Sequence, residues 1–297
     1  MLKSMLRRIA AAFVAAASLA FLPQAAEAKG APALWSVSDA DTTVYLFGTI
    51  HLLPDKYSWR TARFDQAVAG SNELVLETIV DDKDPMKLVG ILTRLGFSNN
   101  VPPIASRVPA AQVPALEAAI AKSGIPRSAF DKMESWAAAF MLLGNQFKDL
   151  GLKSDQGVEM SLRTSFTSQG KPIGELETNS EQLGYFDTLP ESAQRALLEG
   201  AIEDPANMRR AFQAMLAAWS RGDVRAIARS FNRDLSAAPE LKTALLNRRN
   251  ANWSRWIEQR MARPGSVLIA VGAGHLAGSD SVLELLKRDG YKVERVQ

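Results

Sequence analysis

The stretch that decides the fold is residues 44–54, VYLFGTIHLLP. Its first half is apolar and rich in aromatic and β-branched residues, which predicts a buried β-strand that ends near a glycine and His51. Residues 267–276, VLIAVGAGHL, repeat the pattern near the other end of the chain and place His275 at the matching position. The sequence has no other histidine, and each of the two follows an apolar strand in a G-x-x-H motif. Because ligands bind at the carboxyl ends of strands in open α/β sheets, both imidazoles are candidates for one site.

The residues around these two motifs predict an α/β fold. Working outward, we expect strands at 34–38, 44–50, 73–80, 171–177, 266–271 and 291–296, with a turn at 39–41. Helical spacing is expected at 59–69, 84–96, 114–122, 135–150, 156–169, within 190–262 and at 281–288. The strand–helix–strand start favours parallel pairing. The sequence therefore predicts a mixed, mainly parallel central sheet, built from both ends of the chain plus one middle strand, with large helical insertions.

The first 28 residues are typical of an export signal. Lys3, Arg7 and Arg8 precede an apolar segment at 9–22, and Ala26-Glu27-Ala28 has the A-x-A pattern of a cleavage site. No later stretch approaches the roughly 20 apolar residues that a membrane span needs. We therefore expect a periplasmic or secreted protein without a membrane anchor in its mature chain.

The remaining residues, 29–297, are expected to form a single domain. Without cysteine the chain has neither disulfides nor a lipid-modified cysteine, and its 47% hydrophobic residues suffice for an ordinary core. The export signal has three basic residues and one acidic residue, so the formal charge falls from +3 to about +1 when it is removed. No cluster of basic and aromatic residues indicates a nucleic-acid partner. The sequence carries no prediction of the oligomeric state.

Two glutamates occupy positions that are similar to those of the histidines. Glu77 and Glu177 each come late in a strand-like run, inside Leu-Glu-Thr. Two histidines with one or two carboxylates suit a divalent metal such as Mn, Co, Zn or Fe, with a position left for water. Such a metal lowers the pKa of water and so permits hydrolysis of amides or esters. The competing interpretation for each glutamate alone is a solvated or salt-bridged strand end. The motifs of serine hydrolases, P-loop proteins and HExxH proteases are absent.

A basic helical segment precedes the second G-x-x-H strand. It contains Arg249 and Asn250, with Trp253 one turn later. A cationic side chain delivered to a cleft can hold a substrate carboxylate or stabilise an oxyanion. A basic helix surface without a role in a site is the competing interpretation.

Taken together, these segments resemble the TraB/PrgY/GumN family, to which the Tiki metalloproteases are related. The resemblance is carried by LFGTIH at 46–51, the strand with Glu77, GELET at 174–178 followed by Glu181 and Gln182, Arg249-Asn250 with Trp253, and VGAGHL at 271–276. These segments occur in the family's order over nearly the whole mature chain, and the paired G-x-x-H is the most specific of them. The similarity is closest to the exported bacterial branch.

The resemblance implies an α/β fold shared with Tiki, erythromycin esterase-like and ChaN-like proteins, with both histidines in one cleft. Tiki proteins are Mn- or Co-dependent proteases, which implies a divalent metal and a peptide or protein substrate. The implied metal ligands are His51, Glu77 and His275, and the implied catalytic residues are Glu177 and Arg249. The neighbouring residues expected to contact substrate are Gly48, Gln182, Asn250 and Gly272.

Two functions follow from these patterns. The first is an exported metal-dependent hydrolase, with peptides as the expected substrates. The second is a periplasmic binding protein that sequesters a peptide, or an iron or haem ligand, without turnover, since ChaN-like relatives bind haem iron. Haem is the weaker version, because none of the four tyrosines lies beside a G-x-x-H motif.

Overall fold

The computed structural model describes residues 30–80, 84–235 and 238–297. The predicted export signal over 1–28 lies outside these residues. Within the described ranges, no helix combines the length and the apolar character needed to span a bilayer.

Six strands form the central sheet, in the order β6-β4-β7-β2-β1-β8. Their bounds are β1 Leu34–Ser38, β2 Thr42–Thr49, β4 Glu73–Leu76, β6 Ile173–Glu175, β7 Gly265–Gly272 and β8 Val293–Arg295. The neighbours β6, β4, β7 and β2 are parallel, whereas β1 pairs antiparallel with β2 and β8. The predicted mixed, mainly parallel sheet from both ends of the chain is therefore confirmed.

Strand β7 holds the centre of the sheet because it is apolar on both faces. Residues 267–271 are all buried, which is typical of a central parallel strand. It pairs with β2 from Thr42↔Gly265 to Thr49↔Gly272, and with β4 on its other side. Strands β2 and β4 are thus parallel, as the strand–helix–strand start predicts, but β7 lies between them.

The helices occupy nearly all of the segments that the sequence predicts as helical. They are α2 Ala62–Gly70, α3 Pro85–Gly96, α4 Val113–Ser123, α5 Arg127–Phe130, α6 Ser135–Asp149, α7 Val158–Ser168, α8 Asn179–Asp187, α9 Glu191–Gly200, α10 Pro205–Ser220, α11 Val224–Leu235, α12 Pro239–Lys242, α13 Arg248–Met261 and α14 Val282–Arg288. A π-helical turn at Thr243–Asn247 joins α12 to α13. The predicted strand at 73–80 ends early, at Leu76. The carbonyl of Glu77 still accepts from the N–H of Glu177, and the N–H of Ile79 then bonds to the Glu175 side chain.

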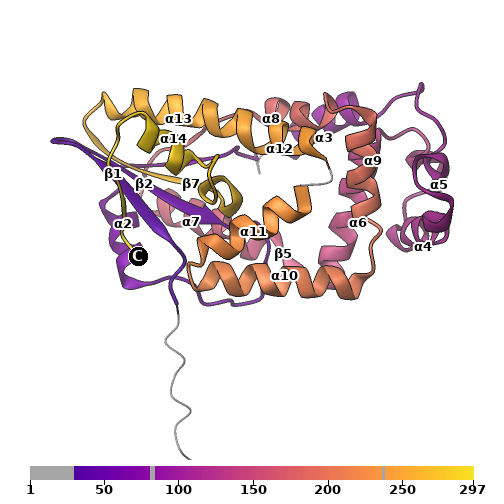
Figure 1. Cartoon of the computed structure of the whole chain (residues 1–297), viewed down its shortest axis with the longest axis horizontal. Helices are drawn as coiled ribbons and strands as arrows, with labels where there is room; N and C mark the ends of the chain where they lie inside the picture. Colours follow the sequence, from indigo (N-terminus) through magenta and orange to yellow (C-terminus); the bar gives the residue numbers. More distant parts are fainter. Residues whose placement is uncertain (1–29, 81–83, 236–237) are drawn as a thin grey trace, which may run out of the picture. The chain divides into compact units, whose positions relative to one another are not determined.

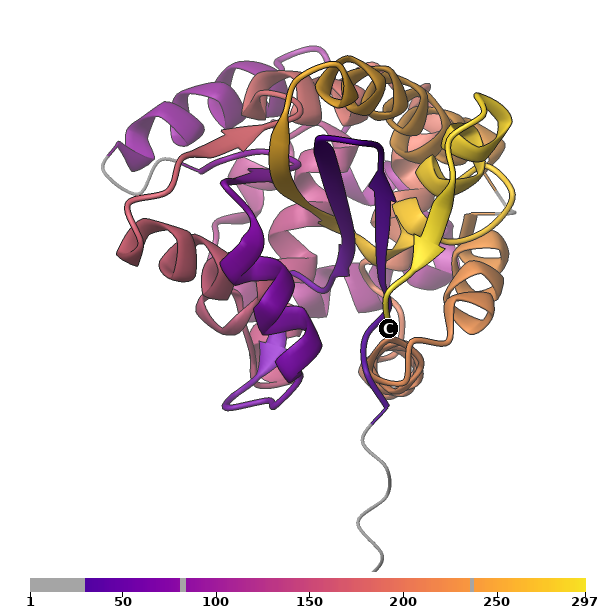
Figure 2. The same cartoon turned by 90° about the vertical axis from the view of Figure 1, so that its left-hand side faces the viewer.

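Helices cover both faces of the sheet. Phe47 and its neighbours on one face pack against α2, α7, α10 and α11, whereas Leu46 and the other face pack against α13 and α14. Figure 2 shows the strands between these two layers. The alternation of Leu46 and Phe47 follows from the two-residue period of a strand.

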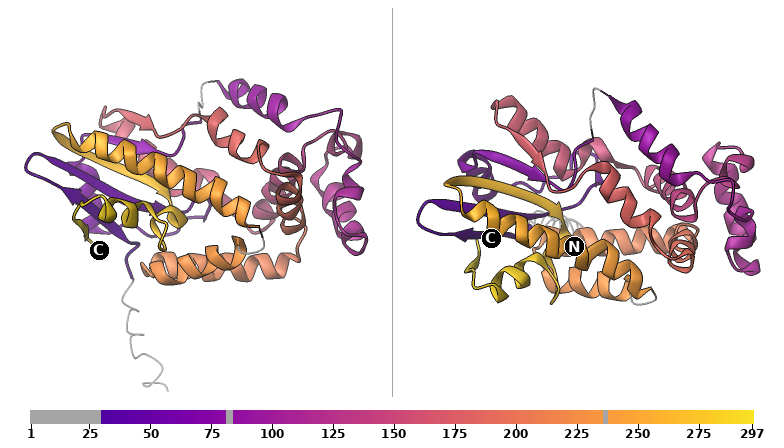
Figure 3. Two further views of the ribbon diagram at one scale, coloured as in Figure 1. Left: turned by 45° about the horizontal axis from the view of Figure 1, so that its top comes forward. Right: turned by 90° about the horizontal axis from the view of Figure 1, so that it is seen from above.

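The helical insertion has a hydrophobic core of its own. Trp136 of α6 is fully buried there among side chains of α4, α5, α8 and α9. Helices α4, α5, α6 and α9 lie at the opposite end from β1 in Figure 1, and α4 lies beyond α6 and α9 in Figure 3. A short antiparallel pair, β3 Leu53–Pro54 and β5 Leu152–Lys153, connects the segment after His51 to the end of α6. Sequence analysis does not predict this pair, since each strand has only two residues.

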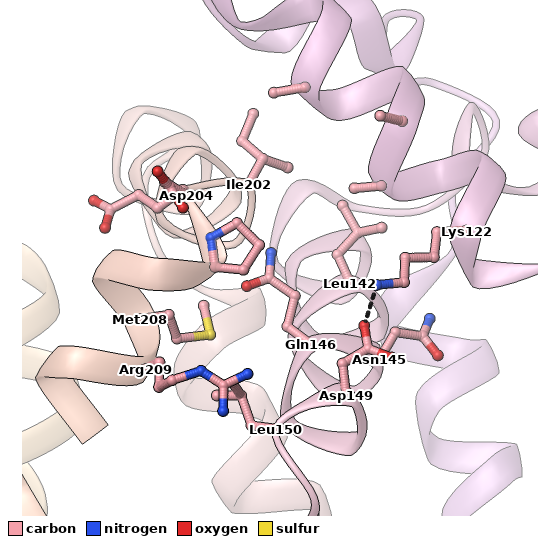
Figure 4. Close-up of a pocket in the computed structure, with 15 residues that line it drawn as sticks. Lys122, Leu142, Asn145, Gln146, Asp149, Leu150, Ile202, Asp204, Met208 and Arg209 are labelled. Atoms are coloured by element: carbon pink, nitrogen blue, oxygen red, sulfur yellow. Dashed lines mark ion pairs between the residues drawn. The ribbon is translucent and has the colours of Figure 1, made fainter. Parts of the chain in front are cut away.

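A cavity of about 790 Å³ lies between α4, α6 and the start of α10. Leu142, Ile202 and Met208 give it apolar walls, and the Lys122–Asp149 ion pair spans 2.6 Å at its edge (Figure 4). None of the predicted site residues lines it. The predicted histidines and glutamates lie instead at the ends of the sheet strands.

Candidate functional site at the carboxyl edge of the sheet

Four adjacent parallel strands each deliver one candidate residue at the carboxyl edge. Glu177 follows β6, Glu77 follows β4, His275 lies in the 3₁₀ turn after β7, and His51 follows β2. Their order along the edge is the strand order of the sheet. Segments far apart in the sequence thus meet at the place where open α/β sheets bind ligands.

The two glutamates are held side by side by backbone pairing that continues past the strands. The N–H of Leu176 donates to the carbonyl of Leu76 at 2.9 Å, and the N–H of Glu177 donates to the carbonyl of Glu77 at 3.0 Å. The capping box of α8, in which Thr178 and Glu181 bond to each other's backbone, then turns the chain away. The two Leu-Glu-Thr tripeptides therefore lie next to each other in space.

Arg249 joins both glutamates and His275 in one buried cluster. Its Nη2 donates to Glu77 Oε2 and Glu177 Oε1, both at 2.6 Å, and its Nε donates to Glu177 Oε1 at 2.9 Å. Its Nη1 lies 3.1 Å from His275 Nε2. The indole of Trp253 lies 4.6 Å from the guanidinium carbon, which adds a cation–π contact. Arg249 therefore belongs to the site and does not form part of a basic helix surface.

Asn250 fixes the tautomer of His275. Its Nδ2 donates to the carbonyl of Asp280, which leaves Oδ1 to face His275 Nδ1 at 2.6 Å. An amide oxygen only accepts, so Nδ1 carries the hydrogen and Nε2 keeps a lone pair toward Arg249. Asn250 is 1% exposed. Its position is therefore that of a residue that orients His275.

His51 has the corresponding arrangement on the open side of the site. Its Nδ1 lies 2.7 Å from Glu159 Oε1, and the same oxygen also accepts from the hydroxyl of Thr49. The imidazole is 65% exposed, in contrast to the buried His275. Gly157 makes this contact possible, because a Cβ there would lie 2.1 Å from the backbone oxygen of His51. Glu159 can approach His51 only because α7 begins so close to this backbone.

The remaining predicted residues lie around these side chains. Gln182 Nε2 donates to Glu77 Oε2 and Glu177 Oε1, each at 3.1 Å, and the N–H of Gly272 donates to Glu77 Oε1 at 2.6 Å. Gly48 is buried in β2, where its carbonyl accepts from the indole of Trp219 and its Cα faces Ala273. Gly48 thus packs the strand end, whereas Gln182 reaches the cleft.

A cleft of about 410 Å³ opens over one half of this edge. His51, Glu77, Glu159 and Gln182 line it, and Met160 contributes an apolar wall. Glu177 and Arg249 do not line the cleft but lie behind Glu77 and Gln182. A ligand in the cleft therefore meets His51 and Glu77 first.

The two glutamates have different surroundings, which shift their pKa values in opposite directions. Burial raises the pKa of Glu77, but the neighbouring His275, Arg249 and His51 and the N–H of Gly272 outweigh this and lower the pKa to about 2. Burial also raises the pKa of Glu177, and the Glu77 charge adds to that rise. When both carboxylates are ionised, they outnumber the one guanidinium, so the cluster favours an additional cation.

The neutral state of His275 predicts an acid-sensitive step in stability. Burial first, then the charges of Arg249 and His51, lower the pKa of His275 from 6.5 to about 3. Because the unfolded chain takes up this proton first, stability falls as the pH drops below 6.5, by about 1.4 kcal/mol per pH unit. Glu159 raises the pKa of His51, so the stabilisation from His51 is fully present below pH 6.5. In His275→Gln, the free energy of unfolding measured with urea should fall less steeply between pH 6.5 and 4.5 than in the unaltered protein. An equally steep fall in both proteins would contradict the assignment of this pH dependence to His275.

The donor atoms fit a divalent metal in kind, although no group of three or more His, Asp or Glu side chains in the described ranges is arranged to hold one. Both imidazoles have Nδ1 held by an oxygen acceptor, the arrangement that orients Nε2 toward metals. A Cβ on Gly272 would lie 3.2 Å from Glu77 Oε1, 3.7 Å from His275 Cδ2 and 3.8 Å from His51 Nε2. The three side chains thus converge on space that a glycine leaves open.

Sequence analysis misses Glu159 entirely. The residue lies in the first turn of a helix, where acidic residues are common for reasons of the helix dipole alone. The available signal is Gly157, two residues earlier, since a glycine at a helix start indicates a close approach of the backbone. Tyr185, whose ring centroid lies 5.9 Å from the guanidinium carbon of Arg249, has no such signal.

The fold and the site define an α/β protein with histidine, glutamate and arginine side chains gathered at the carboxyl edge of its sheet. The chain belongs to the TraB/PrgY/gumN family, whose model matches residues 33–295. It is 24% identical over 247 residues to the uncharacterized protein YbaP of Escherichia coli K12, covering 82% of this chain and 87% of YbaP, and equally to YbaP of Shigella flexneri. No solved structure matches the chain.

Proposed function

We propose that this protein is an exported metal-dependent hydrolase that acts on peptides. The observation that carries the proposal is the paired orientation of the two imidazoles. Asn250 holds Nδ1 of His275 and Glu159 holds Nδ1 of His51, while Glu77 Oε1 lies 3.7 Å from His275 Nε2. Two histidines and one carboxylate form a ligand set for Mn, Co, Zn or Fe.

The proposal assigns a role in the reaction to each side chain of the site. His51, Glu77 and His275 would hold the metal, which when bound acts as a Lewis acid and supplies a nucleophile derived from water. Glu177 is the second carboxylate, which anchors Arg249 and shares Gln182 with Glu77. Both N–H groups of Gln182 donate to the two glutamates, so its Oε1 is the atom that can accept from a substrate N–H at the cleft wall.

The form of the cleft supports a peptide as the substrate. A volume of about 410 Å³ holds a few residues of an extended chain and is open to solvent at His51. Leu76, Val80 and Met160 provide apolar contacts beside the polar groups of Gln182 and Glu159. Such a mixture suits a backbone with side chains of moderate size.

Cleavage of a mixture of synthetic peptides with randomised sequences tests the proposal. The protein, purified after export to the periplasm, is stripped with a chelator and assayed with and without Mn²⁺, Co²⁺ or Zn²⁺. We expect new peptide termini by mass spectrometry only with metal. Stable peptide complexes without products, under all metals, would instead support the sequestering function.

Glu159→Gln should weaken metal affinity by about 10–100-fold while the fold is kept. The amide cannot accept from His51 Nδ1 as strongly as the carboxylate, so the imidazole loses its fixed orientation. Titration against a coloured chelator measures the affinity, and Asp155→Asn, in the turn just before α7, is the matched control. Equal affinity in Glu159→Gln and the control would remove Glu159 from the site.

A further inference from the structure

We propose that Arg249 is an internal cation that competes with the metal for His275 and Glu77. This inference rests on the proposed metal site and concerns its regulation. A divalent ion can use the lone pair of His275 Nε2 only when the guanidinium gives up its bond to that atom. Arg249 thereby sets the metal affinity of the site and keeps the cluster compact without metal.

Every N–H of the guanidinium has an acceptor. Nη1 faces His275 Nε2 at 3.1 Å and the carbonyl of Leu245 at 3.2 Å. Nη2 donates to Glu77 Oε2 and Glu177 Oε1, and Nε donates to Glu177. Arginine has five N–H donors, and all five are used. Arg249 thus has no donor free for a substrate, which distinguishes its geometry from that of an oxyanion-stabilising arginine.

The contacts of Arg249 are of two kinds: those that fix its guanidinium in place, and those to atoms that a metal would also bind. Glu177 accepts from both Nε and Nη2, a bidentate pair that fixes the guanidinium plane, and Leu245 provides a carbonyl from the π-helical turn. His275 and Glu77 are the partners that a metal would also need. The guanidinium can therefore release these two atoms and still keep Glu177 and Leu245.

Electrostatics sets the expected size of the competition. The guanidinium is buried, with 6% of the residue exposed, so water screens its charge poorly. A divalent ion bound at His275 and Glu77 would therefore be strongly repelled by the guanidinium. Part of this is relieved when Arg249 moves toward Glu177. We expect removal of the positive charge to tighten metal binding at least about tenfold.

Calorimetric titration of chelator-treated full-length protein with Mn²⁺ and Co²⁺ tests the proposal. The variants are Arg249→Gln, Arg249→Lys, and Arg249→Gln combined with Glu177→Gln, which avoids two uncompensated buried carboxylates if the single variant does not fold. Arg260→Gln is the matched control, because Arg260 is also a buried arginine of α13, but it pairs with Glu73 at the other end of β4.

We expect Arg249→Gln, or its double variant, to bind at least about tenfold tighter than the unaltered protein, while Arg249→Lys and Arg260→Gln change affinity less than threefold. Unchanged or weaker binding in both Gln variants overturns the competition, and the metal site then stands without it. Binding in the variants but not in the unaltered protein supports the competition and overturns the metal-dependent function. No binding in any protein overturns both.

Discussion

Replacing Arg249 with methionine is expected to destabilise the protein by about 3–5 kcal/mol in the absence of metal. Methionine fills much of the same volume but leaves Glu77 and Glu177 buried beside each other without a counter-charge. It also removes the donor that His275 Nε2 accepts from. Urea unfolding at pH 7 with a chelator present measures the loss.

Arg255→Met is the matched control, because Arg255 lies on the same helix but is exposed. We expect it to change the free energy of unfolding by less than about 0.5 kcal/mol. Adding Glu177→Gln to Arg249→Met should recover part of the loss, since one buried charge is removed. A loss below 1 kcal/mol in Arg249→Met would show that water reaches the carboxylates and that the cluster is not a closed ionic network.

His51→Ala is expected to abolish metal-dependent peptide cleavage while changing stability by less than about 1 kcal/mol. The imidazole is 65% exposed, so its removal leaves no buried cavity. Its loss does remove one of the three proposed metal ligands, the one on the open side of the cleft. Cleavage of the randomised peptide mixture in excess Mn²⁺ or Co²⁺, with unfolding measured in parallel, separates these two effects.

Ser154→Ala serves as the control for this variant, since Ser154 lines the same cleft without being a proposed ligand. It should retain cleavage within about threefold. Cleavage by His51→Ala at the rate of the Ser154 control would exclude His51 from the chemistry and leave the site to Glu77, His275 and Arg249.

The main part of the sheet can be predicted from the sequence because its strands have strong local patterns. The apolar runs before His51 and His275 form β2 and β7, and the glutamates of the Leu-Glu-Thr tripeptides come just after β4 and β6. A glutamate or histidine directly after such a run must lie at the carboxyl edge once the strands are parallel. The strand order is harder to predict from the sequence, because the position of β7 between β2 and β4 depends on burial of both faces of β7.

The use of Arg249 and the presence of Glu159 could not be predicted from local patterns. Both side chains lie on helices, and their contacts with Glu177 and His51 join residues 72 and 108 positions apart. Helical periodicity shows which residues share a face but not which strand end that face meets. Only the packing of α13 and α7 on opposite sides of the sheet brings Arg249 and Glu159 to the same edge.

The most direct measurement is the metal content of the purified protein, compared with that of His51→Ala/His275→Ala. Both proteins are analysed for Mn, Co, Zn and Fe as isolated and after reconstitution. A site shared by the two strand ends predicts about one metal ion per chain, lost in the double variant. Equal metal in both proteins, or none in either after reconstitution, would contradict a metal centre at His51, Glu77 and His275.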